Sequence, residues 1–230
     1  GIFIPSNKLN NAKNGDKAIA EITDWPRHAK NPFGKIIQVL GKPGDNDVEM
    51  NAILSEYQFP LDFPKAVKET AKKINKDISV SEIKKRIDFR NILTFTIDPE
   101  DAKDFDDALS FRILNNENYE IGVHIADVSY YVKQNDIIDK QALKRGTSVY
   151  LVDRVIAMLP EELSNDICSL VPNEDRLTFS VIFEFDKSYN LINHRIEKTI
   201  INSNRRFNYN EVQKIIETKT GEYAKEIEIL

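Results

Sequence analysis

Cysteine is almost absent from this chain, which has one in 230 residues, Cys168. A single cysteine excludes an internal disulfide, and its apolar neighbours predict a small buried side chain, a usage that fits a reducing cytoplasm. Long hydrophobic runs are also missing: no stretch approaches the roughly 20 apolar residues of a membrane helix, and no charged-then-apolar leader opens the chain. We therefore expect a soluble, cytoplasmic, monomeric protein with no membrane partner.

An excess of positive charge is missing as well. The net charge is −5 and the pI about 5.4, which argues against a protein that holds nucleic acid by bulk electrostatics. The charge is unevenly distributed, because residues 65–90 contain nine basic and four acidic side chains, a net charge of +5. We predict a basic helical connector over residues 63–89. It is either a solvated helix face or a surface that contacts nucleic acid, and its composition fits both.

The hydrophobic content of 41% is enough for one large core or two smaller ones. In residues 1–62, short β-rich runs at 2–4, 17–22 and 34–40 alternate with turn signals, a pattern typical of a small OB-type β-barrel. Residues 90–230 mix predicted strands with helices. Their strands are expected at 93–97, 108–113, 119–125, 178–185 and 191–201, and their helices at 136–145 and from 209 onward. The predicted fold class is α+β, a small barrel followed by a mixed domain.

An acidic loop lies between two of these strands. From Asp98 to Asp107 the sequence contains six carboxylates and one lysine. Ionised carboxylates this close repel one another, and a divalent cation would relieve the repulsion. Ligands that offer only oxygen select a hard ion, so the pattern favours Mg²⁺, with Mn²⁺ as the substitute. On spacing alone, a solvated acidic surface loop is an equal alternative.

Calcium is the competing ion for this loop. An EF-hand loop that started at Asp98 would need glycine at its sixth position and glutamate at its twelfth, where this chain has Lys103 and Leu109. The loop therefore does not match an EF-hand. A calcium-stabilised structural domain of another kind stays open as an alternative.

The stretch from Thr96 to Ala108 closely resembles the signature of the ribonuclease II/R (RNB) family, and other segments resemble that family in the same order. These segments are residues 87–90, 122–129, 147–151 and 158–164. The resemblance covers roughly residues 86–209. More loosely, residues 1–62 resemble the cold-shock-like barrel that precedes the catalytic domain in the ribonuclease R branch of the family.

The resemblance implies a processive 3′-to-5′ exoribonuclease that hydrolyses single-stranded RNA to nucleoside 5′-monophosphates with Mg²⁺ and needs no small-molecule cofactor. By position, Asp98 and Asp107 resemble metal ligands. Asp106 resembles the acid on which turnover most depends, and Asp104 a supporting catalytic acid. Residues 90–230 would be the N-terminal portion of the family's RNB catalytic domain.

Two tyrosines match aromatic residues that contact RNA in the family, Tyr150 by stacking on a base and Tyr209 near the RNA channel. Each has a plainer interpretation: without the family match, a strand aromatic and the first apolar residue of a helix are more typical of a core. Arg145 and Arg154 are candidate phosphate ligands, as are Arg176, Arg205 and Arg206, with surface ion pairing as the alternative.

His124 is expected to be a hydrogen-bonded structural histidine rather than a general base, because it alternates with Val123 and Ile125 in a predicted strand. Asp127, which follows this strand, is more typical of a helix N-cap than of a metal ligand.

The chain begins at Gly1, and residues 223–230 are predicted to be helical up to the end, so we expect a piece of a longer protein. The family's catalytic domain continues well beyond this length. We therefore expect little or no processive activity from this piece alone. Two other functions stay open: an RNA-binding module with an inert acidic loop, and the calcium-stabilised domain.

Overall fold

A computed structural model describes residues 1–230. The chain forms two compact units, Gly1–Phe63 and Pro64–Leu230. None of its helices has the length and apolar character that spanning a membrane requires.

The first unit is built on an antiparallel pair of strands, β1 (Lys17–Asp24) and β2 (Phe33–Gly41). Phe3 adds an isolated bridge to Phe33, so all three predicted β-runs take part in pairing. Gly34 has to be glycine here, because a Cβ atom would lie 2.7 Å from Ile2 Cγ2 and 2.8 Å from the Glu21 carbonyl oxygen. The regular pairing in this unit is one two-stranded sheet.

Two helical segments complete the first unit, the 3₁₀ turn η1 (Ser6–Lys8) and helix α1 (Asn46–Glu56). Helix α1 was not predicted from the sequence. Its start is nevertheless marked locally, because the Asp45 side chain accepts a hydrogen bond from the Asp47 N–H. The helix has no apolar stripe at helical spacing, which is why periodicity did not reveal it.

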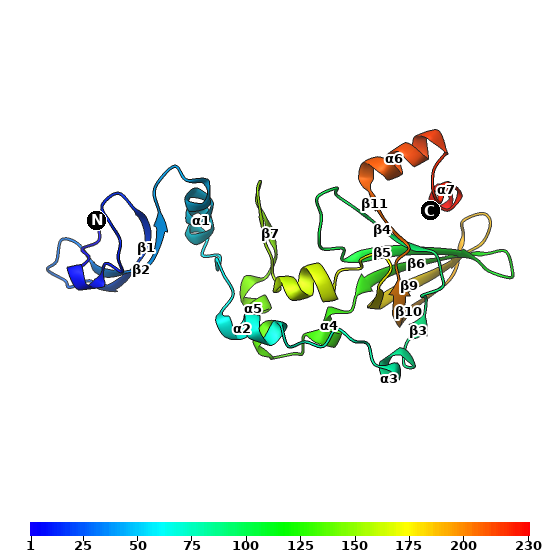
Figure 1. The fold of residues 1–230 in the computed structure, drawn as a ribbon, viewed down its shortest axis with the longest axis horizontal. Coiled ribbons are helices and arrows are strands. Elements are labelled where there is room, and N and C mark those ends of the chain that lie inside the picture. The colour runs from blue at the N-terminus through cyan, green and yellow to red at the C-terminus, as the bar shows by residue number, and fades with distance from the viewer. The chain divides into compact units, whose positions relative to one another are not determined.

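The second unit contains a seven-stranded sheet in the order β11-β4-β5-β6-β9-β10-β3 (Figure 1). The central strands are antiparallel, whereas β11 is parallel to β4 and β3 is parallel to β10. The strands are β3 (Ile87–Asp88), β4 (Thr94–Asp98), β5 (Asp107–Ile113), β6 (Tyr119–Ala126), β9 (Asp175–Phe185), β10 (Leu191–Asn202) and β11 (Arg205–Asn208). A separate hairpin pairs β7 (Val149–Tyr150) with β8 (Val155–Ile156). All five strands predicted in this unit are present.

The second unit also contains seven helical elements. They are α2 (Lys65–Ala71), α3 (Val80–Ile83), α4 (Val128–Tyr131), α5 (Ile137–Arg145), the π-helical turn η2 (Leu163–Ile167), α6 (Tyr209–Thr218) and α7 (Ala224–Ile229). The predicted C-terminal end of α5 and the predicted start of α6 are confirmed. Gly146 takes a positive φ of 75° after α5, and Asn208 caps the start of α6 in a capping box with Glu211.

Side chains alternate between the two faces of the sheet. One face carries apolar residues, and α6 and α7 cover it at the β11–β4 end, where Phe95, Phe207, Ile215 and Ile227 form a core (Figure 1). The opposite face carries small hydroxyl side chains around the fully buried His124. Cys168 is free and buried, as predicted.

The predicted basic connector is part of the second unit, where α2 contacts α5. One of its cations is neither solvated nor available to nucleic acid: the Arg86 side chain is fully buried. It donates to Asp127 at 2.7 Å and to Glu82 at 2.8 Å. Asp127 stands at the N-cap position of α4 as expected, but its carboxylate accepts from Arg86 and Ser129 instead of capping that helix.

Candidate active site

The acidic loop connects two neighbouring strands that separate from each other. Strands β4 and β5 pair only at Thr94 with Ser110 and Phe95 with Leu109. Beyond these pairs, Asp98 ends β4 and Asp107 begins β5. On its other side β4 continues to pair with β11, which places Asn208 opposite Asp98. The acidic loop therefore lies at the C-terminal ends of β4 and β11, next to the start of α6.

Asp98 is the buried member of the acidic group, with 9% of its surface exposed. Its Oδ2 atom is buried and has no hydrogen-bond partner. Burial is the largest influence on its pKa and raises it, and the negative charges of Asp107 and Asp104 raise it further, while the nearby Thr96 hydroxyl and the charge of Arg206 lower it. A buried carboxylate oxygen without a partner is costly unless a ligand satisfies it.

Asp106 lies at the surface, on the side of the loop that leads into β5. The protein atoms around its carboxyl group remove part of its hydration, which raises its pKa, and the charges of Asp104, Asp107 and Asp98 add to the rise. The four aspartates predicted from the sequence are therefore close enough to influence one another. Together they form a site with an excess of negative charge.

The donors of this site fit a hard cation, because they are carboxylate oxygens and one of them, Asp98 Oδ2, is a buried atom without a partner. No set of three or more His, Cys, Asp or Glu side chains in the structure stands in a ready metal-binding arrangement. What the structure supplies is proximity of the carboxylates and their uncompensated charge.

Tyr150 is brought to the loop from the β7–β8 hairpin. Its hydroxyl donates to Asp104 Oδ2 at 2.8 Å, and this hydrogen bond is the main reason that the pKa of Tyr150 rises to about 12. The residue is 64% exposed, so the core interpretation is wrong for it. The ring is available to a ligand beside the acidic loop.

Tyr209 is the first residue of α6 and follows Asn208, the register partner of Asp98. It is 58% exposed, so it too is not a core residue. The structure therefore places both predicted tyrosines at the surface, Tyr150 in contact with the acidic loop and Tyr209 one residue beyond the position that pairs with its first aspartate.

The arginines predicted as phosphate ligands differ in their burial and in their hydrogen-bond partners. Arg145 is 5% exposed and donates to the Ala157 carbonyl oxygen at 3.2 Å, which gives it a packing role, while its contact with RNA stays a prediction. Arg154 pairs with the adjacent Asp153 at 2.7 Å on the β7–β8 hairpin. Arg176 is buried and donates to the backbone carbonyl groups of residues 166, 169 and 175.

His124 is confirmed as a structural residue. It is fully buried, and its two ring nitrogens lie 2.7 Å from Ser180 Oγ and 2.8 Å from Ser110 Oγ. Burial lowers its pKa to about 4, so the ring is neutral at pH 7.

Two residues that hold the acidic loop were not recognised as such from the sequence. Ser169 contacts the backbone of Lys103 and Phe105, and Arg206 donates to the carbonyl groups of Pro99 and Glu100. Ser169 lies just beyond one of the family-like segments, at 158–164, but nothing in its neighbours indicates which part of the chain it contacts. Arg206 was predicted only as a candidate phosphate ligand.

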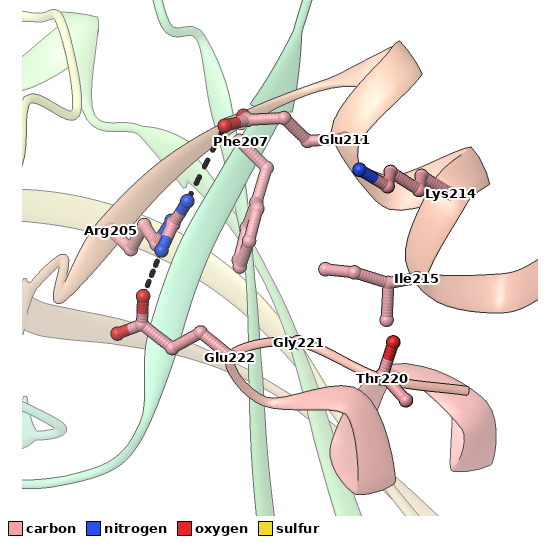
Figure 2. Close-up of a pocket in the computed structure, with 8 residues that line it drawn as sticks. All are labelled: Arg205, Phe207, Glu211, Lys214, Ile215, Thr220, Gly221 and Glu222. Carbon is pink, nitrogen blue, oxygen red and sulfur yellow. Dashed lines mark hydrogen bonds and ion pairs between the residues drawn. The ribbon is translucent and has the colours of Figure 1, made fainter. Parts of the chain in front are cut away.

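A cavity of about 340 Å³ lies beside β11, under α6 and the turn that follows it (Figure 2). Arg205 spans it and pairs with Glu211 and Glu222. The other lining residues include Phe207 and Lys214, and none comes from the acidic loop. Arg205 is therefore engaged in ion pairs at this cavity.

Comparison with known proteins identifies both units. The RNB domain family model matches residues 86–229, and a cold shock domain model matches residues 1–64. These matches confirm the predicted fold class, although the first unit has a two-stranded sheet as its regular β-structure.

Individual relatives agree with these assignments. Ribonuclease R of Thermotoga maritima is 42% identical over 217 residues, which cover 94% of this chain and 31% of that protein. The chain thus spans less than a third of the length of this curated relative. Mycoplasma genitalium RNase R, solved in complex with ribose-methylated single-stranded RNA, superimposes with a TM-score of 0.87 at 27% identity, covering 99% of this chain and 36% of that one.

The same fold also occurs in yeast Ssd1, described as a pseudonuclease, with a TM-score of 0.73, 21% identity, and coverage of 96% of this chain and 29% of that one. At this identity the likeness concerns the fold alone. The fold by itself therefore does not establish catalysis, and the residues of the acidic loop have to carry that argument.

Proposed function

The chain belongs to the RNB domain family, and we propose that it forms the acidic half of the active site of a 3′-to-5′ exoribonuclease. The proposed reaction is processive hydrolysis of single-stranded RNA to nucleoside 5′-monophosphates, with Mg²⁺ or Mn²⁺ as the ion, by a monomer in the cytoplasm. The proposal depends on one observation above all. Asp98, Asp104, Asp106 and Asp107 share one loop, where loss of hydration, and after it the charges of the neighbouring aspartates, raise the pKa values of Asp98 and Asp106.

Asp98 and Asp107 are the proposed metal ligands, since they stand where the two strands enter and leave the loop. A bound Mg²⁺ would neutralise charge on the scissile phosphate and lower the pKa of a water molecule. The unpartnered Oδ2 of Asp98 supports this assignment, because a cation would satisfy it.

Asp106 is the proposed acid on which turnover depends. A carboxylate whose pKa is raised is a better proton acceptor than an ordinary surface aspartate, and Asp106 is open to solvent, so an attacking water molecule can reach it. Asp104 has a supporting role, because its carboxylate accepts the hydrogen bond that holds Tyr150 against the loop.

Tyr150 is the proposed base-stacking residue, and Tyr209 is the proposed contact near the RNA channel that favours RNA over DNA. Stacking of a base on an aromatic ring contributes about 1–3 kcal/mol without sequence preference, which suits an enzyme that degrades any sequence. Both rings are more than half exposed, which supports this role. That an RNase R structure was solved with single-stranded RNA adds to the support.

The experiment compares the full-length parent protein with its Asp106→Asn variant, using 5′-labelled single-stranded RNA and Mg²⁺. The exchange of one oxygen for an amide removes the proton acceptor with little change in shape. We expect turnover to fall on the order of 10²- to 10⁴-fold while RNA binding is retained. We also expect the 230-residue chain alone to show little or no processive activity, and complete degradation by it would overturn that expectation.

The second candidate function is an RNA-binding module whose acidic loop is inert, and the observation that favours it is that no three carboxylates of this chain stand in a ready metal-binding arrangement. A binder would show RNA affinity without Mg²⁺-dependent products at any protein concentration, and Asp106→Asn would change nothing. A calcium-stabilised domain is distinguished by thermal melts, since only that function predicts a large selective stabilisation by Ca²⁺ over Mg²⁺.

A further inference from the structure

A hydroxyl group from a distant part of the chain holds the acidic loop at its centre. Ser169 is fully buried and lies 64 residues after Phe105. Its Oγ atom accepts a hydrogen bond from the Phe105 N–H at 3.0 Å and donates to the Lys103 carbonyl oxygen at 3.1 Å. These two peptide groups flank Asp104, so one hydroxyl fixes the backbone on both sides of a proposed catalytic acid.

The position of Ser169 is itself fixed. Arg176 Nε donates to the Ser169 carbonyl oxygen at 2.8 Å, and the Leu170 N–H donates to the Phe105 carbonyl oxygen at 2.8 Å. Ser169 also follows closely on the π-helical turn η2, a type of turn that is frequent at functional sites. The backbone of Ser169 is therefore held from outside the loop by Arg176, and its neighbour Leu170 adds a third hydrogen bond between this segment and the loop.

The first half of the loop is held from another side. Arg206 on β11 donates to the carbonyl oxygens of Pro99 at 2.5 Å and Glu100 at 2.6 Å, and its guanidinium carbon lies 5.4 Å from the centre of the Phe105 ring. Both Ser169 and Arg206 bind peptide groups and not carboxylates. The loop can thus be ordered while the carboxylates of Asp98 and Asp107, the proposed metal ligands, remain available to a cation.

We propose that Ser169 is a positioning residue that sets the spacing of the four aspartates, an inference that rests on the proposed metal-dependent function. Four carboxylates that repel one another would spread apart in an unrestrained loop. The Ser169 hydroxyl opposes that spreading through neutral hydrogen bonds, much as outer-shell groups orient metal ligands. Removal of such a group typically lowers metal affinity or activity about 10- to 100-fold.

The test uses the 230-residue chain, with Mn²⁺ as the probe ion, and compares Ser169→Ala with Ser180→Ala. Ser180 is a matched control, because it is also a fully buried serine with hydrogen bonds in the same unit, but it bonds to His124 and Thr199 and not to the loop. Mn²⁺ affinity is measured by electron paramagnetic resonance. We expect Ser169→Ala to weaken Mn²⁺ binding about 10-fold or more and Ser180→Ala to leave it unchanged.

Amide exchange of Phe105, followed by NMR, gives a readout that needs no metal. In the unmodified chain we expect this amide to be protected, and in Ser169→Ala to exchange about 10-fold faster. Should Ser169→Ala fail to fold, the unmodified chain still decides the matter, because a Phe105 amide that exchanges as fast as the exposed amide of Asp101 overturns the proposal.

The outcomes separate this inference from the proposed function. If the unmodified chain binds no Mn²⁺, the proposed metal site fails, and Phe105 exchange alone then decides whether Ser169 orders the loop. If the unmodified chain binds Mn²⁺ and Ser169→Ala binds it as tightly as Ser180→Ala does, the metal site stands and the positioning role is wrong.

Discussion

Two polar clusters on the same sheet differ in almost every physical property. Around His124, both ring nitrogens have a serine hydroxyl as partner, the side chains are buried, and the ring is neutral because burial lowers its pKa to about 4. In the acidic loop, a carboxylate oxygen of Asp98 is buried without a partner, and the pKa values of Asp98 and Asp106 are raised.

The difference separates a structural cluster from a candidate active site. A cluster whose donors and acceptors are all paired orders the core and has little left with which to bind a ligand. A cluster with unsatisfied oxygens and excess negative charge is destabilising by itself and is stabilised when a cation binds. The choice of His124 as a catalytic base would therefore have been wrong, although histidine is the residue most often used for that purpose.

The largest expected effect concerns pH, to which the two clusters respond with opposite sign. The pKa of His124 is about 4 in the folded chain and about 6.5 when unfolded, so the unfolded state binds the extra proton between these values. The stability due to His124 is present above pH 6.5 and is lost as the pH falls toward 4, by on the order of 3 kcal/mol. The raised pKa values of Asp98 and Asp106 act the other way, adding stability at low pH that is lost as the pH rises through their folded values.

Denaturant unfolding between pH 7 and pH 4.5 measures this balance. We expect the free energy of unfolding of the unmodified chain to decrease as the pH is lowered from 7 to 4.5. The decrease should be smaller in His124→Gln. The exposed His194 provides the control, since His194→Gln should keep the unmodified slope. An NMR titration in which the His124 ring protonates near pH 6.5 would contradict the assignment.

A smaller effect is expected at Gly122, which leaves space for the His124 cluster. A Cβ atom at this position would lie 2.4 Å from Ser110 Oγ and 2.5 Å from His124 Nε2. Glycine to alanine in a strand would otherwise be neutral or stabilising, so we expect Gly122→Ala to lower the free energy of unfolding by about 1–3 kcal/mol through this overlap. Thermal or denaturant melts measure the loss.

The matched test repeats Gly122→Ala in a Ser110→Ala background, where one of the two overlapping groups is gone. Gly122→Ala should then lower the free energy of unfolding by less than it does in the unmodified chain, because residues 110 and 122 are coupled through direct contact. Equal losses in both backgrounds would mean that the overlap is not the cause.

The smallest expected effect is at Tyr150, where the acidic loop meets solvent. Tyr150→Phe removes the hydrogen bond to Asp104 and keeps the ring, so we expect RNA affinity to change by about threefold or less. Tyr150→Ala also removes the stacking surface and should weaken binding by about 1–3 kcal/mol. Filter binding of single-stranded RNA measures both.

Tyr189→Ala is the control for that experiment, because Tyr189 is 57% exposed and lies in the turn between β9 and β10. It should leave RNA affinity unchanged. A loss as large as that of Tyr150→Ala would show that general loss of surface aromatics, and not stacking beside the acidic loop, governs binding.

Much of the fold could be predicted because its signals are local. The strands on either side of the acidic loop alternate apolar and polar residues, α5 ends at Gly146, and α6 begins at the capping residue Asn208. Each of these signals lies within a few residues of the element it marks. The acidic loop was found in the same way, from the density of its carboxylates.

Apart from helix α1, whose residues show no apolar periodicity, the features that were missed depend on contacts between distant segments. The parallel pairing of β11 with β4 joins residues more than 100 positions apart, and it brings Asn208 opposite Asp98. The burial of Arg86 beside Asp127 is of the same kind, since its charge alone predicted a surface position. Neither could be read from local composition.

The sequence by itself determined which chemical groups are present: an oxygen-rich acidic loop between two strands, two tyrosines at positions that resemble RNA contacts of the RNB family, and a histidine in an apolar strand. The tertiary structure decided which of these groups act together. It brought Tyr150 to Asp104, enclosed His124 between two serines, and placed Ser169 and Arg206 on the backbone of the acidic loop. The physical reason is that hydrogen bonds and charge interactions act over a few ångströms of space, whatever the separation of the residues along the chain.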